Sequence, residues 1–194
     1  MRQVTGRTNP QQNKKQVSIR ISGGHSFSVP AGADPKCAEV VEWLTPHTVV
    51  VPKELFCEEE AAACLALQGY TIPEGCRVVW STATEPIVAV MAVAEEALAM
   101  LPSTVQHTTP LLHMPTVLQP TVWICDAGDL IYIKVYDPAL QFAEVIAVEG
   151  EADRAYLIER LAERIDTERF LLMLDDRAKQ ISLYKRHFNK VICE

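Results

Sequence analysis

The sequence has no hydrophobic run long enough to cross a membrane, no closely spaced cysteine pair and no excess of positive charge. The nearest candidate span, residues 87–101, is interrupted by Glu95 and Glu96 and is shorter than the roughly twenty apolar residues that a spanning helix needs. The chain has 18 lysines and arginines against 25 aspartates and glutamates, a formal net charge of -7. That balance argues against general nucleic-acid binding, which depends on basic side chains neutralising phosphates. We therefore expect neither membranes nor nucleic acids as partners.

The cysteines are spread along the chain without CxxC or CxxxC spacing. They are Cys37, Cys57, Cys64, Cys76, Cys125 and Cys193. Dispersed cysteines without a framework predict reduced, buried thiols in a reducing compartment. Residues 1–16 contain no apolar segment, so we expect a disordered leader rather than a targeting peptide. The sequence thus predicts a cytoplasmic protein.

With 194 residues, 48% of them hydrophobic and 22% charged, the chain has the composition of an ordinary globular protein. This length is short for two independent domains. The composition therefore favours one domain built from two closely packed halves.

The first half begins with a hairpin. Val17, Ile19 and Ile21 alternate with polar residues, and Gly23-Gly24 suits a two-residue turn with positive backbone angles. Apolar spacing and helix or strand breakers predict the later elements of this half. These are a strand at Thr48–Val51, a helix at Cys57–Gln68 that ends at Gly69, strands at Arg77–Ser81 and Ile87–Val90, and a helix at Ala92–Met100.

Prolines between residues 104 and 120 allow a short strand and a connector there, and we place the boundary between the halves in this stretch. The second half repeats the order of the first, with a tight turn at Asp126-Ala127-Gly128-Asp129. Its predicted elements are strands at Val122–Cys125, Leu130–Tyr136 and Gln141–Val148, a helix at Glu151–Ile165, a strand at Phe170–Leu174, a helix at Ala178–Phe188 and a strand at Val191–Cys193.

Each half thus reads as three antiparallel strands followed by helix–strand crossovers. This tandem layout is typical of the actin-like, Hsp70-like and sugar-kinase-like ATPases, a ribonuclease H-like fold in which a nucleotide lies between two lobes. We therefore predict a duplicated α/β actin-like ATPase fold, with a first lobe at residues 17–118 and a second lobe at residues 119–194.

The chain also resembles an uncharacterised family from Bacteroides and relatives, a domain of unknown function with an actin-like ATPase (ASKHA) fold. The resemblance extends from Val17 to the C-terminus and is carried by three segments. They are VSIRISGGHSFSV, VWICDAGDLIYIKVYDPALQFAEVIAVEG and RFLLMLDDRAKQISLYKRHFNKV. The resemblance implies the fold and a bacterial cytosolic setting, and it implies no particular activity.

Active members of the wider superfamily use two hairpin turns to surround the nucleotide phosphates, usually with an aspartate in each turn. Here the first turn has Gly23 and Gly24 but no aspartate, whereas Asp126-Ala127-Gly128 matches the Asp-x-Gly pattern of the second turn. The turn expected to admit adenosine, at residues 174–177, has no glycine and carries two carboxylates. If a ligand site persists between the lobes, its candidate residues are Ser22, Gly23, Gly24, Asp126, Gly128 and Asp129.

An intact fold pattern with an eroded nucleotide site predicts a degenerate, non-catalytic protein that binds a protein partner or associates with itself. No cofactor is expected under this interpretation. The alternative is a nucleotide-binding ATPase or phosphotransferase that holds Mg-ATP between the lobes. Fold analogy alone does not name the partner.

Two further groups of residues are interpreted structurally. His107, His113 and Cys125 match no recognised zinc spacing, so no metal site is predicted from them. Trp43, Trp80 and Trp123 lie in or beside apolar segments and are expected in the core or at an interface.

Overall fold

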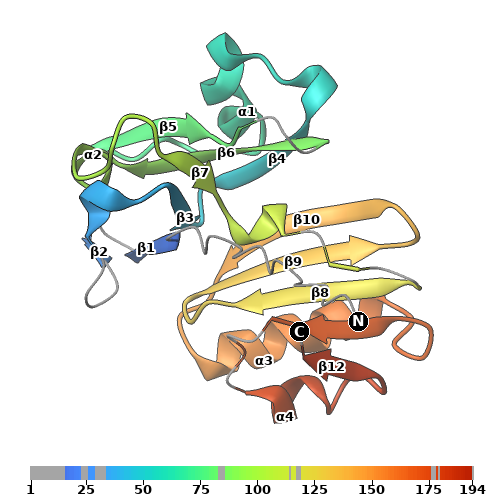
Figure 1. The fold of residues 1–194 in the computed structure, drawn as a ribbon. Coiled ribbons are helices and arrows are strands. Elements are labelled where there is room, and N and C mark those ends of the chain that lie inside the picture. The colour runs from blue at the N-terminus through green and yellow to red at the C-terminus, as the bar shows by residue number, and fades with distance from the viewer. Residues whose placement is uncertain are drawn as a thin grey trace, which may run out of the picture.

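The structure is a computed structural model that describes residues 16–22, 26–28, 34–82, 86–113, 115–116, 119–175, 178 and 180–193. The described chain forms three β-sheets with short helices against them, and the C-terminal sheet packs below the other two in the view of Figure 1. This is a mixed α/β architecture, as the sequence predicts.

The N-terminal sheet has four strands in the order β2-β1-β3-β7. Their bounds are β1 Gln16–Ser22, β2 Ser26–Ser28, β3 Val40–Leu44 and β7 Gln106–Thr108. The antiparallel β1–β2 pair confirms the predicted hairpin, and β3 and β7 continue the sheet in parallel. Strand β3 was not predicted, because Glu42 interrupts its apolar run although that side chain is only 6% exposed.

The inserted sheet has three antiparallel strands in the order β4-β6-β5. They are β4 Thr48–Pro52, β5 Cys76–Trp80 and β6 Ile87–Ala94. Residues 48–51 were predicted to form a third antiparallel strand of the first lobe, whereas β4 pairs with β6 in this separate sheet. The physical reason is β6, which is buried over almost its whole length, so its backbone groups need a partner on each edge and find one in β4 and one in β5. Among its described residues, the first half therefore lacks the expected third antiparallel strand, although its sheet shares with the second half an antiparallel hairpin followed by two parallel strands.

The helices of the first half are short. They are η1 Pro35–Cys37, η2 Lys53–Leu55, η3 Glu58–Glu60, α1 Ala61–Leu67, α2 Glu95–Ala99 and η4 Pro110–Leu112. Helix α1 buries Ala61 and Leu65 against the inserted sheet and is followed by Gly69, whose φ of 80° ends the helix as predicted. The predicted helix at residues 92–100 is wrong at its start, because Ala92 to Ala94 pair with β5 and extend β6.

The C-terminal sheet has five strands in the order β10-β9-β8-β11-β12. They are β8 Thr121–Asp126, β9 Leu130–Tyr136, β10 Leu140–Ala147, β11 Leu171–Leu174 and β12 Val191–Cys193. Strands β8, β9 and β10 are antiparallel, and β11 and β12 are parallel to β8. The helices are α3 Glu151–Arg164 and α4 Ile181–Tyr184, the second much shorter than the predicted 178–188. The predicted strand order of this half is otherwise confirmed.

The side chains of β8 point alternately to the two faces of the sheet, and each face has its own core. Val122 and Ile124 pack with Ile158 of α3 and Tyr184 of α4. Trp123, Cys125 and their neighbours on β9 face the other side, where Leu44 and Leu111 of the first half join the same cluster. Because successive side chains of a strand point to opposite faces, β8 separates a helix-covered core from the core that joins the two halves.

The thiols depart in part from the sequence-based expectation. None of the six cysteines forms a disulfide, and Cys125 is buried. Cys37, Cys57 and Cys193 are exposed, so the prediction that the cysteines are buried is wrong for these three. Cys37 is the last residue of η1 and Cys57 precedes η3, and these short 3₁₀ segments bury none of their own residues.

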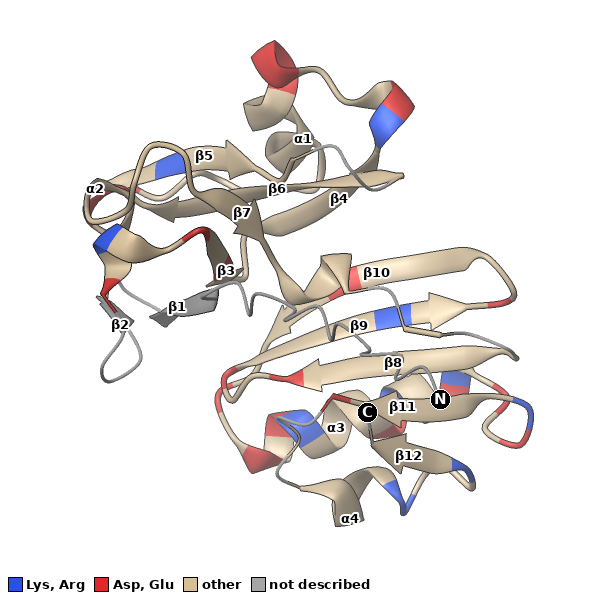
Figure 2. Cartoon of the chain, viewed as in Figure 1, with Lys and Arg blue, Asp and Glu red and all other residues tan. Residues whose placement is uncertain are grey.

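Charged residues gather on helices and in loops, whereas long stretches of the strands are uncharged (Figure 2). Within the described ranges, no helix combines the length and apolarity that a bilayer crossing requires.

Trp43 and His107 link two neighbouring strands of the N-terminal sheet. The Trp43 indole N–H donates to His107 Nδ1 at 2.9 Å, and Trp43 is fully buried. Burial lowers the pKa of the His107 imidazole below its usual value. The neutral ring is the form that accepts this hydrogen bond, since imidazolium carries a proton on each nitrogen.

Folding stability should therefore fall as pH drops below about 6.5, because the unfolded chain then binds more protons at His107 than the folded chain does. His107→Asn retains an acceptor and does not titrate in this range, so its unfolding free energy should fall less between about pH 7.5 and pH 5.5. Urea unfolding at both pH values measures the difference. Burial also lowers the pKa of His47, but His47 is present in both proteins, so its contribution cancels in the comparison. Equal acid sensitivity of the two proteins would contradict the assignment.

Candidate functional site

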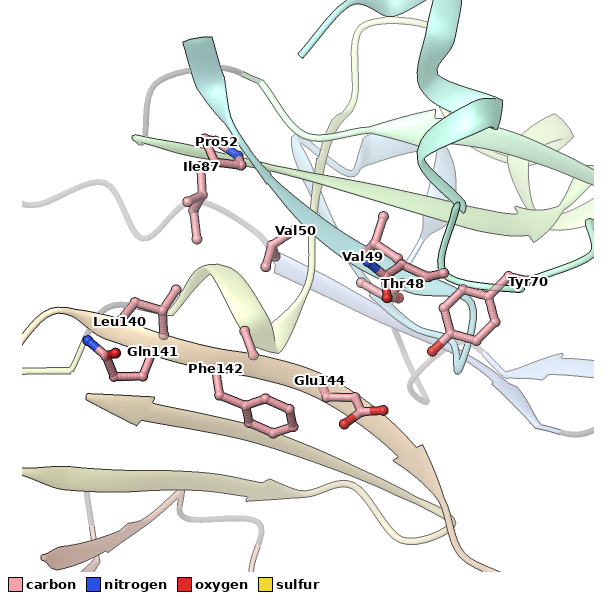
Figure 3. Close-up of a pocket in the computed structure, with 12 residues that line it drawn as sticks. Thr48, Val49, Val50, Pro52, Tyr70, Ile87, Leu140, Gln141, Phe142 and Glu144 are labelled. Carbon is pink, nitrogen blue, oxygen red and sulfur yellow. The ribbon is translucent and has the colours of Figure 1, made fainter. Parts of the chain in front are cut away.

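A groove lies between the inserted sheet and the C-terminal sheet, with a volume of about 500 Å³. Thr48, Val49 and Val50 of β4 line one wall and residues 140–144 of β10 line the other. Figure 3 shows Val50 directed from β4 towards β10, with Tyr70 and Glu144 at one end of the groove and Pro52 and Ile87 at the other. The groove thus has apolar side chains along its middle and polar side chains at both ends, with Gln141 near Ile87 and with Tyr70 and Glu144 at the other end.

The Tyr70 end carries negative rather than positive charge. Burial, reinforced by the nearby Glu144 carboxylate, raises the pKa of the Tyr70 hydroxyl, which therefore stays protonated. His47 contacts the Tyr70 ring edge-on with centroids 5.5 Å apart, and burial lowers the pKa of that imidazole. Glu144 is the charged residue of the described lining, which contains neither lysine nor arginine. A phosphate placed here would meet a carboxylate and no cation.

Asp126, the aspartate of the predicted phosphate turn, is bound within the helix-covered side of the C-terminal sheet. Arg154 of α3 brings Nε to 3.0 Å from Oδ2 as an ion pair without hydrogen-bond alignment, and its Nη2 donates to Oδ1 at 3.3 Å. The Tyr184 hydroxyl donates to Oδ2 at 3.0 Å. Asp126 has the same parity on β8 as Val122 and Ile124, which explains why it faces α3 and α4.

The turn that follows Asp126 also hydrogen-bonds to Arg154. Gly128 has a φ of 90°, a conformation that favours glycine, and its N–H donates to Asp126 Oδ1 at 3.3 Å. The Gly128 carbonyl accepts a hydrogen bond from Arg154. The Asp129 carbonyl accepts from the N–H of Val148 at 2.8 Å, so the turn is also joined to the end of β10.

Burial, followed by the adjacent Asp126 carboxylate, strongly raises the pKa of the Tyr184 hydroxyl. Tyr184 therefore remains a proton donor over the whole physiological pH range. Asp126 and Arg154 are only 7% and 8% exposed. The three side chains form a buried, mutually compensating cluster, which we call the Asp126 cluster.

Of the six candidate ligand residues, the structure brings Asp126, Gly128 and Asp129 together in one turn. Ser22 ends β1, and Gly23 and Gly24 lie outside the described residues. The placement of the two turns relative to each other therefore stays a prediction.

Neither partner of Asp126 was predicted from the sequence. Arg154 lies one helical turn before Ile158 on the apolar stripe of α3, where a charged residue signals a buried ionic partner. Tyr184 lies between Ile181 and Phe188 on the stripe of the next helix, and both tyrosine and arginine pack in the helix-covered side of the sheet. A charged residue on an otherwise apolar helix stripe was the available signal.

A second buried cation fixes the connector between the halves. Lys134 of β9 is fully buried, donates to the His113 carbonyl and places Nζ 4.1 Å from the centre of the Trp123 ring. The His113 ring stacks on Trp123 with centroids 5.3 Å apart. His107 instead bonds to Trp43, so the two histidines belong to different clusters. The described residues contain no group of three or more potential metal-ligating side chains.

Asp126→Ala should lower the free energy of unfolding by about 3–5 kcal/mol, because it leaves Arg154 buried without its counter-ion. Tyr184→Phe removes one hydrogen bond to a carboxylate that Arg154 still neutralises, and should cost about 1 kcal/mol. Urea unfolding measures both changes, with the exposed Glu159→Ala as a control expected within about 0.5 kcal/mol of the parent. An Asp126→Ala protein as stable as the control would contradict a structural role for this carboxylate.

The sequence matches no protein-family model and no curated protein. In structure, the chain is similar to a Bacteroides thetaiotaomicron protein with an actin-like ATPase fold and unknown function, with a TM-score of 0.69 and 14% sequence identity over 93% of this chain and 91% of that chain. The likeness confirms the predicted resemblance and shows an actin-like ATPase fold. At this identity it shows the fold alone.

A second solved structure matches less well. The cytoplasmic domain of EpsL, an inner-membrane component of the type II secretion system of Vibrio cholerae, has a TM-score of 0.40 and 11% identity, covering 82% of this chain and 81% of that chain. A similarity at this level carries no argument about the present chain.

Proposed function

We propose that this chain is a degenerate, non-catalytic protein of the actin-like fold that acts by binding another protein. Its two lobes are residues 17–118 and 119–194, and the partner occupies the groove between β4 and β10. The observation that supports this most directly is the Asp126 cluster, in which both carboxylate oxygens already contact Arg154 or Tyr184.

An aspartate that positions Mg²⁺ or an attacking water must present an oxygen to the nucleotide. For Asp126 to do this, Arg154 would have to leave its carboxylate, and separating a buried pair of this kind costs about 3–5 kcal/mol. The parity of β8 also directs Asp126 to the face covered by α3 and α4 rather than to the face that joins the halves. Both points weigh against phosphoryl chemistry at this turn.

The groove has the chemistry of a polypeptide site. Its lining combines apolar side chains with the hydroxyls of Thr48 and Tyr70 and with glutamine amides, and Glu144 supplies its charge. None of the six cysteines forms a disulfide, which is consistent with a reducing compartment, so we place the protein in the cytoplasm.

The second candidate is a nucleotide-binding ATPase or phosphotransferase. The Asp-x-Gly turn and the fold shared with the Bacteroides thetaiotaomicron protein favour it. It requires a rearrangement in which Asp126 exchanges Arg154 for a bound metal ion.

Titration calorimetry with Mg-ATP and Mg-ADP should give no binding heat, because neither the Asp126 turn nor the groove offers a free cationic or metal-ligating site in its described residues. Thermal denaturation should be unchanged by nucleotide, whereas a ligand present at a hundred times its dissociation constant would add about 2.7 kcal/mol. Asp126→Asn is the matched variant. Binding by the parent that this variant lacks would overturn the proposal and support the second candidate.

A further inference from the structure

The wall of the groove formed by β4 is an open strand edge. Within the described sheet β4 is the outermost strand, next to β6. The N–H of Ala92 donates to the His47 carbonyl, and the N–H of Lys53 donates to the Pro86 carbonyl. In an antiparallel pair, residues that hydrogen-bond to the neighbouring strand alternate with residues that do not. Between these two bonds, Val49 and Val51 are therefore the residues that bond to β6. The backbone N–H and C=O groups of Thr48 and Val50 therefore point away from β6, towards the groove. Pro52 follows the same parity, and its lack of an N–H costs the sheet nothing at an outward position.

The opposite wall is a second open edge. Strand β10 is the outermost strand of the C-terminal sheet in the described chain, next to β9. The hydrogen bond from the Val148 N–H to the Asp129 carbonyl shows which residues of this strand bond to β9, because every second residue does so. Phe142 and Glu144 therefore bond to β9, and the backbone N–H and C=O of Ala143 point away from it. No strand pairing joins β10 to β4 among the described residues. Two strand edges therefore face one groove.

We propose that this groove binds an extended peptide segment of a partner protein, which pairs with the free edge of β10 at Ala143 and is covered by β4. The inference rests on the proposed function, because it names the chemistry of the partner in the same groove. An extended chain is the ligand that satisfies a row of backbone donors and acceptors, and strand addition to an exposed edge is a recurrent mode of peptide recognition. A volume of about 500 Å³ accepts a short segment rather than a whole domain.

Side chains of the groove define the segment. Val50, Ile87 and Leu140 favour apolar side chains along it. Glu144 is exposed and uncompensated by any lysine or arginine of the described lining, which favours a Lys or Arg in the segment next to it. The preferred ligand is therefore an extended, mainly apolar peptide with one basic residue placed at the Tyr70 end.

The probe is a phage-displayed library of random peptides of about twelve residues, selected against the parent protein and against Ala143→Pro. Proline at this outward position removes one edge N–H without removing a bond to β9, so the variant should fold. Peptides enriched on the parent should be apolar with a Lys or Arg. Synthetic copies should bind Ala143→Pro at least about tenfold more weakly, and Ala143→Val, which keeps the N–H, should bind them nearly as the parent does.

Glu144→Gln supplies a second variant that does not change the backbone. It should weaken the basic peptides severalfold and reduce the salt dependence of their binding. Amide hydrogen exchange of Ala143 should slow on peptide binding, whereas Phe142 and Glu144, already bonded to β9, should change little. No enrichment over the Ala143→Pro selection, or peptides that bind this variant as tightly as the parent, would overturn the inference.

Other outcomes separate this inference from the proposed function. Peptide binding together with Mg-ATP binding would contradict the non-catalytic proposal and leave the peptide site standing. Absence of both would overturn the peptide site alone. A concentration-dependent dimer that Ala143→Pro abolishes would assign the edge to a second copy of this chain and overturn the assignment to a partner's peptide.

Discussion

The ion pair between Asp126 and Arg154 is the interaction on which the C-terminal half depends. Arg154 holds the carboxylate at the end of β8 and the Gly128 carbonyl in the turn that follows. Tyr184 of α4 completes the contact. Through one carboxylate, the sheet, its first turn and both covering helices are connected. Removing one partner of a buried ion pair lowers stability far more than removing one partner of a surface pair. Substitutions at this turn that separate Asp126 from Arg154 should therefore destabilise the fold.

The alternation of side chains along β8 decides which of its functional groups face the groove side of the sheet. Because β8 alternates, its carboxylate points to the helices, while Trp123 and Cys125 point to the core shared with the first half. The groove beyond that core is bounded by the edges of β4 and β10. Its polar groups are hydroxyls, glutamine amides, backbone amides and the Glu144 carboxylate, without a lysine or arginine in the described lining. The site expected to hold phosphates and the open groove are thus different places with different chemistry.

Elements with a strong local pattern were predictable from the sequence. Strands β8, β9 and β10 and helix α3 agree with the predicted ranges within two residues, because alternation and the stripe around Ile158 are local signals. The pairing of β4 was not predictable, since a strand's own residues do not say which partner it joins. Neither was the start of α2, where alanines that also suit a helix are drawn into β6 by pairing with β5.

The same distinction applies to the candidate site. Asp126 and Gly128 were found by the Asp-x-Gly pattern, and Gly128 indeed adopts the positive φ that such a turn uses. What the carboxylate does there depends on Arg154, 28 residues later in the chain, and on Tyr184, 58 residues later. A motif identifies a turn, but the long-range partners decide whether its aspartate is available to a ligand.

The most direct test of this account is the coupling free energy between Asp126 and Arg154 in a double-mutant cycle. It uses Asp126→Leu, Arg154→Met and the combined variant, with urea unfolding of each protein. The account predicts a double variant much more stable than the sum of the single losses implies, with a coupling of at least about 2 kcal/mol. Additive losses within about 0.5 kcal/mol would show that the two charges do not depend on each other, and would contradict the claim that Asp126 is committed to the fold.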